Sequence, residues 1–364
     1  MVSRDNPGDS AERDIFLREI CESPDTLLHS AEALAAQADA LAGIRSTLEG
    51  RRVTLTGMGS SADAVTGLAS ILGRRGMDCP NIHTAELLHY RMDALGPGAA
   101  AVVAVSQSGL SIEAVKMTAK LRQKGGIPLV AVTNAPDSPL AEAADVSLDI
   151  AAGDEQGPSS KTYVATMLLM HVLAEVIGTD KPIDTVVEQS RGHAEQAAGA
   201  LREWLKDAEG LGQALADWIE PADALMVLGR GVSVAPAELN GLVLKESAHV
   251  PAQSMDSAEF RHGPLELAGP GLNAVLMCLE PIQASLDARL RQDLIARGAS
   301  VKAIGVEAAE TPGLPLDYSL PGTAPLIDAG CAALPLLLAA WAEASRRSET
   351  PGAFHVGAKV TTCE

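Results

Sequence analysis

The hydrophobic pattern of the chain changes character near residue 50. From Ile15 to Leu48, Ala and Leu recur at helical spacing, and Ser23-Pro24-Asp25 is expected to break or cap the helix. After Arg51, short β-rich runs alternate with amphipathic helical stretches, which predicts a parallel sheet with helices on both faces. The runs expected to form strands in this half are Val53–Thr56, Ala100–Val105, Pro128–Val132 and Val146–Ile150.

The second half of the chain repeats this plan at a fixed distance. Ala224–Leu228 leads into Gly229-Arg230-Gly231, which follows Gly57-Met58-Gly59 by 172 residues (229 − 57). The apolar run that ends at Cys278 lies at the same offset from the second strand, but no Ser/Gln loop follows it. We therefore predict two related α/β domains, each a flavodoxin-like three-layer unit with a mostly parallel sheet.

The length of 364 residues also suits two domains. Charged helical sequence without a strand, between Gly178 and Glu209, marks the expected boundary. The expected division is a helical segment at 1–48, a first domain at 49–180, a second domain at 205–345 and a C-terminal tail at 346–364.

Composition narrows the choice of core and of partner. Hydrophobic residues make up 47% of the chain and aromatic residues only 2%, so the core is expected to be aliphatic. The net charge of −19 argues against nucleic acids and anionic membranes, because both need a basic surface. A single phosphate stays compatible with this charge, since a local ring of backbone N–H groups and hydroxyls can hold it.

Three further features concern the compartment. The five cysteines show no CxxC or pairing pattern, which favours a reducing environment. The polar start, Met1–Arg13, lacks the apolar stretch of a signal peptide. The longest apolar run, Ala332–Ala342, is too short to span a bilayer. The chain is therefore predicted to be soluble and cytoplasmic.

Two Ser-containing loops follow predicted strands. Ser106-Gln107-Ser108-Gly109-Leu110-Ser111 places hydroxyls, an amide and a glycine at a helix start, where they could surround a phosphate. The alternative is a Ser-rich helix cap without a ligand. Gly59-Ser60-Ser61 is a similar but weaker signal. Neither loop is a Walker A sequence or a complete dinucleotide fingerprint, and we expect no metal or cofactor.

Three residues outside these loops could carry chemistry. Glu246, in an Ala/Leu-rich helix, could move a proton between sugar carbons, or it could be an exposed helical glutamate. His262 precedes a Gly-Pro break and could be a general acid or a structural loop histidine. Lys359 could form a Schiff base if buried, or it could be a solvated tail lysine. The residues alone leave these alternatives open.

Together, these features resemble the tandem sugar-isomerase (SIS) family, in particular the isomerase half of glucosamine-6-phosphate synthase and its stand-alone relatives. The resemblance covers nearly the whole chain. The segments that carry it are Gly59-Ser60-Ser61, Ser106–Ser111, Asp154 through Ser159-Ser160-Lys161, Leu244-Lys245-Glu246, Glu259–Pro264 and Ala358–Thr361.

The resemblance implies roles by position. Glu246 would move a proton between C1 and C2, His262 would open the sugar ring in the neighbouring subunit's site, and Lys359 would form a Schiff base. Such sharing implies a homodimer, with the C-terminal tail reaching the active site. Val243 replaces a family lysine, and Glu349-Thr350-Pro351-Gly352 departs from the motif before the tail lysine. The residues expected to hold the sugar phosphate are Gly59, Ser60, Ser61, Ser106, Gln107, Ser108, Ser111 and Ser159.

The resemblance also indicates a reaction. The synthase carries an N-terminal glutaminase domain, and about forty residues before the first SIS domain leave no room for one here. We therefore expect an amino-sugar-phosphate deaminase that converts glucosamine 6-phosphate to fructose 6-phosphate and ammonia. The alternatives are a galactosamine-6-phosphate deaminase/isomerase, a fructosamine-6-phosphate deglycase, or a non-catalytic phosphosugar sensor. Retention of Glu246, His262 and Lys359 together disfavours the sensor.

Overall fold

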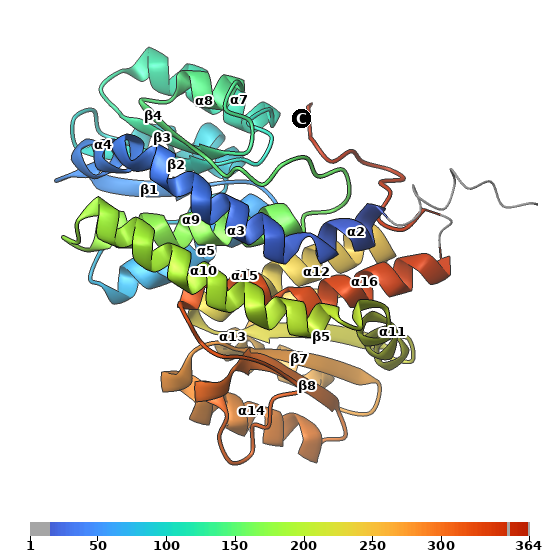
Figure 1. Ribbon diagram of the computed structural model, residues 1–364. Coiled ribbons are helices and arrows are strands. Elements are labelled where there is room, and N and C mark those ends of the chain that lie inside the picture. The colour runs from blue at the N-terminus through green and yellow to red at the C-terminus, as the bar shows by residue number, and fades with distance from the viewer. Residues whose placement is uncertain (1–14, 348–349, 363–364) are drawn as a thin grey trace, which may run out of the picture.

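The computed structural model describes residues 15–347 and 350–362. Figure 1 shows two sheets, one above the other, with a layer of helices between them and further helices outside. The expectations for the polar start Met1–Arg13, for Glu349 and for Cys363 lie outside the described residues.

The first sheet contains the four strands predicted in the first half of the chain. All of its pairs are parallel, in the order β1-β2-β3-β4. A single bridge from Leu55 to Asn81 extends the sheet beyond β1. Counting that bridge as a position, the order is 2-1-3-4-5, the flavodoxin-like arrangement. The strands are β1 (Arg52–Thr56), β2 (Ala100–Val105), β3 (Leu129–Thr133) and β4 (Val146–Asp149).

The second sheet has the same order, β6-β5-β7-β8-β9, and is also parallel throughout. The offset of 172 relates three pairs of strands, since β1 and β5 begin at 52 and 224, β2 and β7 at 100 and 272, and β4 and β9 at 146 and 318; β3 and β8 begin at 129 and 300, an offset of 171. The sequence pattern identified only β5 and β7 in this half. The strands are β5 (Ala224–Gly229), β6 (Gln253–Asp256), β7 (Leu272–Cys278), β8 (Ser300–Val306) and β9 (Tyr318–Leu320).

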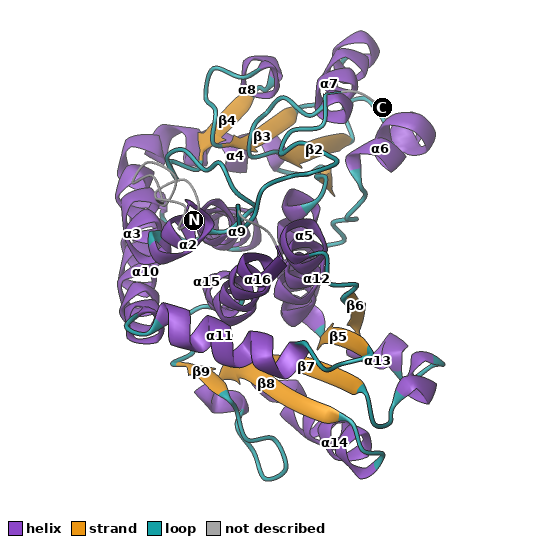
Figure 2. Cartoon of the chain, turned by 90° about the vertical axis from the view of Figure 1, so that its right-hand side faces the viewer, coloured by secondary structure: helices purple, strands orange, loops and turns teal. Residues whose placement is uncertain are grey.

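Helices α5, α9, α12, α15 and α16 lie between the two sheets (Figure 2). The predicted N-terminal helix is broken next to Ser23, as expected, and again by a 3-10 turn at Leu34–Gln37. The helices are α2 (Ile15–Cys21), α3 (Ser23–Ala33), α4 (Ala38–Leu48), α5 (Ser60–Arg74), α6 (Thr84–Glu86), α7 (Ile112–Lys124), α8 (Pro139–Ala143), α9 (Lys161–Gly178), α10 (Ile183–Leu205), α11 (Ala208–Ile219), α12 (Val234–Ala248), α13 (Ser257–Phe260), α14 (Ala284–Ala296), α15 (Pro325–Ala332) and α16 (Leu334–Arg347).

The core is aliphatic, as the composition predicted, with Tyr163, Phe16 and Phe260 as its few large aromatic side chains. The apolar run Ala332–Ala342 lies within Pro325–Arg347, which, like Lys161–Gly178, is long and apolar enough to cross a membrane by length and composition. In each, 89% of the apolar window is buried inside the fold, so packing between the two sheets accounts for the apolarity.

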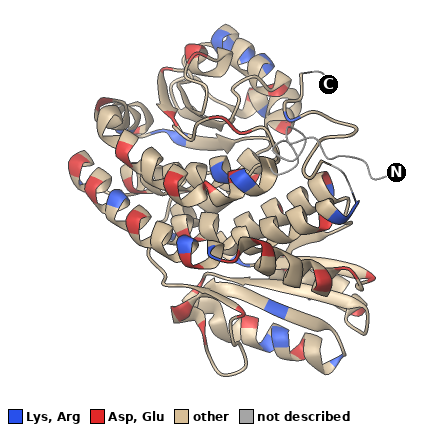
Figure 3. Ribbon diagram, turned by 45° about the vertical axis from the view of Figure 1, so that its right-hand side comes forward, with Lys and Arg blue, Asp and Glu red and all other residues tan. Residues whose placement is uncertain are grey.

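Basic and acidic positions are interspersed along the helices and strands in Figure 3. This agrees with the excess of acidic residues in the sequence.

Candidate active site

The first turn of the site connects β1 to α5. Gly57 packs so closely under this turn that a Cβ would lie 2.8 Å from the backbone carbon of Ser61. Gly59 has a φ of +51°, a conformation that L side chains rarely adopt. The backbone can therefore bend sharply and begin α5 at Ser60, directly above the carboxyl end of β1. No side chain caps this helix start, and within the turn Ser61 N donates to Met58 O at 3.1 Å and Ala62 N to Gly59 O at 2.8 Å.

The second turn, Ser106–Ser111, connects β2 to α7. Ser106 and Ser108 shape it: their hydroxyls accept hydrogen bonds from Gly109 N and Leu110 N, each at 3.2 Å. Ser111 is the N-cap residue of α7, yet its side chain makes no capping hydrogen bond. The serines are therefore not accounted for by helix capping, which was the alternative that the sequence left open.

The two turns meet because β1 and β2 are adjacent parallel strands. In a sheet of this order, the gap between these strands is the switch point, where helices leave toward opposite faces and ligands bind. The N-terminal ends of α5 and α7 both border one cavity of about 240 Å³. Two helix starts without side-chain caps, facing one space, form an environment that favours an anion.

All predicted site residues except His262 lie around this cavity. Its lining comes from the two turns, from the loop before α9, from α12 and from the C-terminal tail. The lining residues are Met58, Gly59, Ser60, Ser61, Ser106, Gln107, Ser108, Ser111, Glu113, Glu155, Ser159, Leu242, Glu246, Phe354, Ala358, Lys359, Val360 and Thr361.

Glu246 enters the cavity from α12, across from the two turns. Burial raises the pKa of its carboxyl above the ordinary value, and the nearby charges of Lys245 and Lys359 partly oppose this rise. A carboxylate with a raised pKa is a stronger base than an exposed one, as a proton shuttle between carbon atoms requires.

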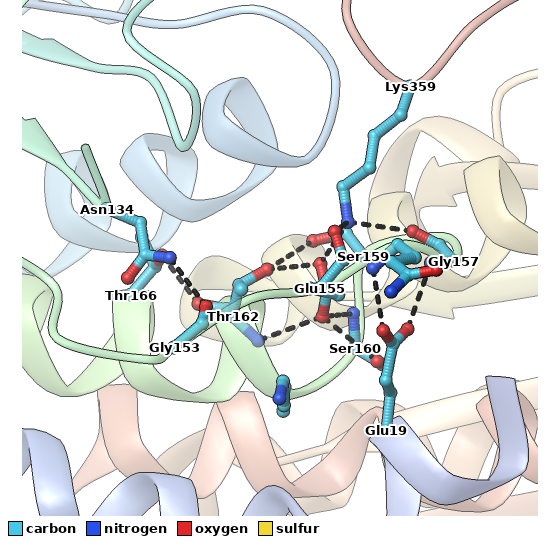
Figure 4. A network of polar contacts seen from close by, with 12 residues as sticks. Glu19, Asn134, Gly153, Glu155, Gly157, Ser159, Ser160, Thr162, Thr166 and Lys359 are labelled. Carbon is cyan, nitrogen blue, oxygen red and sulfur yellow. Dashed lines mark hydrogen bonds and ion pairs between the residues drawn. The ribbon is translucent and has the colours of Figure 1, made fainter. Parts of the chain in front are cut away.

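Lys359 is held inside the cavity by the loop before α9 (Figure 4). Its ammonium donates to Glu155 O at 2.6 Å, to Glu155 Oε2 at 2.9 Å and to Gly157 O at 2.8 Å. The tail that carries it is also fixed to α7, because Ile112 N donates to Thr361 O at 3.1 Å. Lys359 is therefore a tail lysine directed inward, but its ammonium is fully engaged in this state.

Glu155 organises the loop around Lys359. Its Oε1 accepts from Ser160 N at 2.9 Å and Thr162 N at 3.1 Å, so the carboxylate caps the start of α9. The N-terminal helix α2 supports the same loop, because Glu19 accepts from Gln156 N and Gly157 N (Figure 4). This explains how a residue near the start of the chain helps to position a C-terminal lysine.

Comparison with known proteins agrees with this geometry. The SIS domain family model matches residues 48–176. Residues 48–176 are a SIS domain. The domain is homologous to the isomerase half of glutamine–fructose-6-phosphate aminotransferase. The isomerizing aminotransferase of Pyrobaculum aerophilum is 27% identical, over 96% of this chain and 57% of that enzyme.

Two solved structures show how far the likeness extends. The C-terminal domain of glucosamine-fructose-6-phosphate aminotransferase from Francisella tularensis has a TM-score of 0.77 at 21% identity and covers 91% of this chain and 95% of that one. A Silicibacter pomeroyi DSS-3 protein, described provisionally as a phosphosugar isomerase, has a TM-score of 0.72 at 26% identity, over 91% and 98%. The chain spans about half the length of the curated relatives it matches first.

The SIS domain contains two cavity residues that the sequence reading missed. Asp154, where the third motif was expected to begin, is exposed, whereas its neighbour Glu155 is buried in the cavity wall. Glu113, in the first turn of α7, was also overlooked. The sequence offered a weak signal for Glu113, which follows the Ser-rich turn at the start of α7, and none that separates Glu155 from Asp154.

His262 is not brought to the cavity of the SIS domain by this chain. Its side chain is exposed on the turn after α13, and its backbone N–H donates to the carbonyl oxygen of Glu259 at 2.9 Å. Its assignment to a neighbouring subunit's site stays a prediction, as does the homodimer. Val243 is buried with 1% exposure, so the position of the family lysine faces the core rather than the cavity.

Proposed function

We propose that this protein acts on an amino-sugar phosphate at C1 and C2, converting glucosamine 6-phosphate and water to fructose 6-phosphate and ammonia. The observation that carries this proposal is the composition of one cavity. Two helix starts without side-chain caps, the carboxylate of Glu246 and the amine of Lys359 all line the same space. An anion site, a base and a nucleophilic amine are the groups that isomerisation of a phosphosugar needs.

The phosphate end of the substrate belongs at the two turns. The hydroxyls of Ser60, Ser61 and Ser111 provide donors to a phosphate dianion, and the starts of α5 and α7 add the positive ends of two helix dipoles. The net charge of −19 does not oppose this, because the donors are local and the helix dipoles add to them.

The other end of the cavity favours an amine. Glu155 and Glu246 line it together with one lysine, so carboxylates exceed cations. A neutral sugar would meet these groups only through hydroxyls, whereas an ammonium at C2 would gain charge-assisted hydrogen bonds. The curated relatives are named as aminotransferases of fructose 6-phosphate, which supports a hexose 6-phosphate with nitrogen at C2.

The chemistry follows from these positions. In the open-chain sugar, Glu246 removes the proton from C2, the C2–C1 bond gains double-bond character and the aldehyde oxygen becomes a hydroxyl. Glu246 then returns a proton to C1, which leaves an imine at C2. Addition of water to that imine and loss of ammonia give the ketone of fructose 6-phosphate. Lys359 would first exchange its contacts with Glu155 for the aldehyde oxygen at C1, and its ammonium would donate the proton that makes this oxygen a hydroxyl.

We also propose that the active unit is a homodimer. His262 is exposed and lies outside the cavity of its own chain, which is the placement expected of a residue that completes a neighbour's site. A symmetric dimer would place each His262 at the other subunit's cavity by the same contact. Its imidazole could then open the sugar ring by protonating the ring oxygen.

The test is to incubate the purified chain with glucosamine 6-phosphate and to measure ammonia and fructose 6-phosphate. Galactosamine 6-phosphate is the parallel arm, because it differs at one hydroxyl only. We expect ammonia and ketose in equal amounts from one of the two. Absence of ammonia with both substrates would refute the deaminase proposal, and ketose formation from a hexose phosphate without nitrogen would replace it with a simple isomerase.

A further inference from the structure

A second cavity, of about 260 Å³, lies at the opposite end of α5 from the candidate active site. Helix α5 begins at Ser60, beside the first cavity, and ends at Arg74, beside the second. The wall of the second cavity also includes α9, through His171 and Glu175, and the start of α15, at Pro325 and Leu326.

The internal repeat relates the two cavities. Subtracting 172 from Glu246 gives Arg74, and subtracting it from Pro325 gives Gly153, where the loop that carries Glu155 begins. The repeat therefore relates α5, in the wall of the second cavity, to α12, in the wall of the first, and relates the start of α15 to the loop that carries Glu155. At the position equivalent to Glu246, the second cavity has an arginine.

The second repeat has lost the phosphate-binding turn in a specific way. Glu280 lies 172 residues after Ser108, and its Oε1 accepts from Val232 N at 3.3 Å, at the turn before α12. Its Oε2 accepts from Arg74 Nη1 at 2.6 Å. The carboxylate of Glu280 therefore accepts the hydrogen bond from Val232 N that a bound phosphate would otherwise accept. The cavity itself lies on the other side of this carboxylate, beside Arg74.

The second cavity is positively charged. Arg74, Arg75 and Lys181 face the carboxylates of Glu280 and Glu175, which leaves an excess of one positive charge in a chain of net charge −19. The start of α15 adds a helix N-terminus whose N-cap residue makes no side-chain hydrogen bond.

His171 is a polar side chain in this wall, and its ring packs edge-on against that of His193, with the ring centroids 5.4 Å apart. It is buried to 92% and lines the cavity, and no hydrogen bond joins its ring nitrogens to a side chain or backbone group of the described ranges. Burial lowers its pKa to about 4, so the imidazole is neutral at physiological pH and offers one donor and one acceptor. A buried polar group without a partner is costly unless a ligand or water satisfies it.

We propose that this cavity is a second binding site, for a small metabolite that carries a phosphate or carboxylate group. The two guanidinium groups and the start of α15 bind the anionic group, and His171 bonds to a polar atom on the rest of the ligand. The proposal does not depend on the reaction at the first cavity.

Binding stoichiometry tests it. Isothermal titration calorimetry would use inorganic phosphate in one arm and citrate in the other, with the full chain, to distinguish the two anion types. Ser106→Ala/Ser108→Ala weakens the first cavity only. The double variant Arg74→Gln/Glu280→Gln removes one positive and one negative charge at the second cavity. The variant His171→Phe removes the ring nitrogens but keeps an aromatic ring in the core.

The expected result is a phosphate or citrate site that survives Ser106→Ala/Ser108→Ala but weakens at least tenfold in Arg74→Gln/Glu280→Gln, and measurably in His171→Phe. Circular dichroism checks that each variant is folded; if the charge variant is not, His171→Phe decides. Binding that is lost completely in the loop variant would overturn the proposal, as would binding that neither second-cavity variant changes. Binding of neither anion by the wild type at millimolar concentration would overturn it too.

Discussion

Gly109 is the position where the shape of the phosphate turn can be tested most sharply. It has a φ of +62°, and a Cβ there would lie 2.0 Å from Ser138 Oγ and 2.5 Å from Ser138 Cβ. Ser138 cannot easily move aside, because its Oγ caps α8 by accepting from Ala141 N. Gly109→Ala therefore combines backbone strain with a steric clash under the turn.

The two contributions can be separated. A left-handed conformation costs an L residue about 1–2 kcal/mol, and overpacking a tight site costs about 1–3 kcal/mol more. Gly50→Ala is the matched control, because Gly50 has a φ of +68° but nothing lies within 4 Å of its added Cβ. We expect Gly109→Ala to lower the free energy of unfolding by about 1–3 kcal/mol more than Gly50→Ala does.

Urea unfolding measures the free energy of unfolding of each variant. The KM for the sugar phosphate reports whether the Ser106–Ser111 turn still binds the substrate. Gly109→Ala should raise KM, because the displaced turn no longer presents its N–H groups together, whereas Gly50→Ala should leave KM unchanged. If Gly109→Ala is no more destabilised than Gly50→Ala and its KM is unchanged, the turn is not the phosphate site that its geometry implies.

Three other predictions follow from the same structure. Because the base must be ionised and burial raises the pKa of Glu246, activity should fall as pH drops through a value above 4.5, and Lys245→Gln should move this limb of the pH–rate profile upward. Mixing Glu246→Gln with His262→Ala subunits should restore about a quarter of wild-type activity if the histidine acts in the partner, and none if it acts in its own chain. Burial raises the pKa of Asp328 to about 6, so its carboxyl costs stability as pH rises from about 4 to 6; chemical denaturation should show Asp328→Asn losing less stability over that range than the wild type.

The fold could be predicted to a large extent because its signal is local. Buried parallel strands such as Ala100–Val105 are continuous apolar runs, and the sequence repeats them at an offset that the structure keeps. Strand β6, Gln253–Asp256, was not predicted because three of its four residues are polar and it lies at the edge of the sheet. The strand β8 begins with exposed and half-buried residues, so only its second half looks apolar.

The site was predicted less completely because burial is a tertiary property. Glu155 and Asp154 are adjacent carboxylates that the sequence cannot tell apart, and only the packing of Glu19 against the loop decides which one faces inward. The inward position of Lys359 depends on that same loop, which lies about two hundred residues earlier in the chain. The role of His262 could not be derived from its own chain, because its side chain is exposed and its predicted site belongs to a neighbouring subunit.

The most direct test of the account is turnover and binding in Glu246→Gln, with Glu238→Gln as control. Glu238 lies two turns earlier on α12 and is also partly buried, but it does not line the cavity. Glu246→Gln should lose about 10²–10⁴-fold in kcat while its Kd for glucosamine 6-phosphate stays within about twofold, since the phosphate turns are untouched. Glu238→Gln should keep both values. Undiminished kcat in Glu246→Gln would contradict the assignment of this carboxylate as the base.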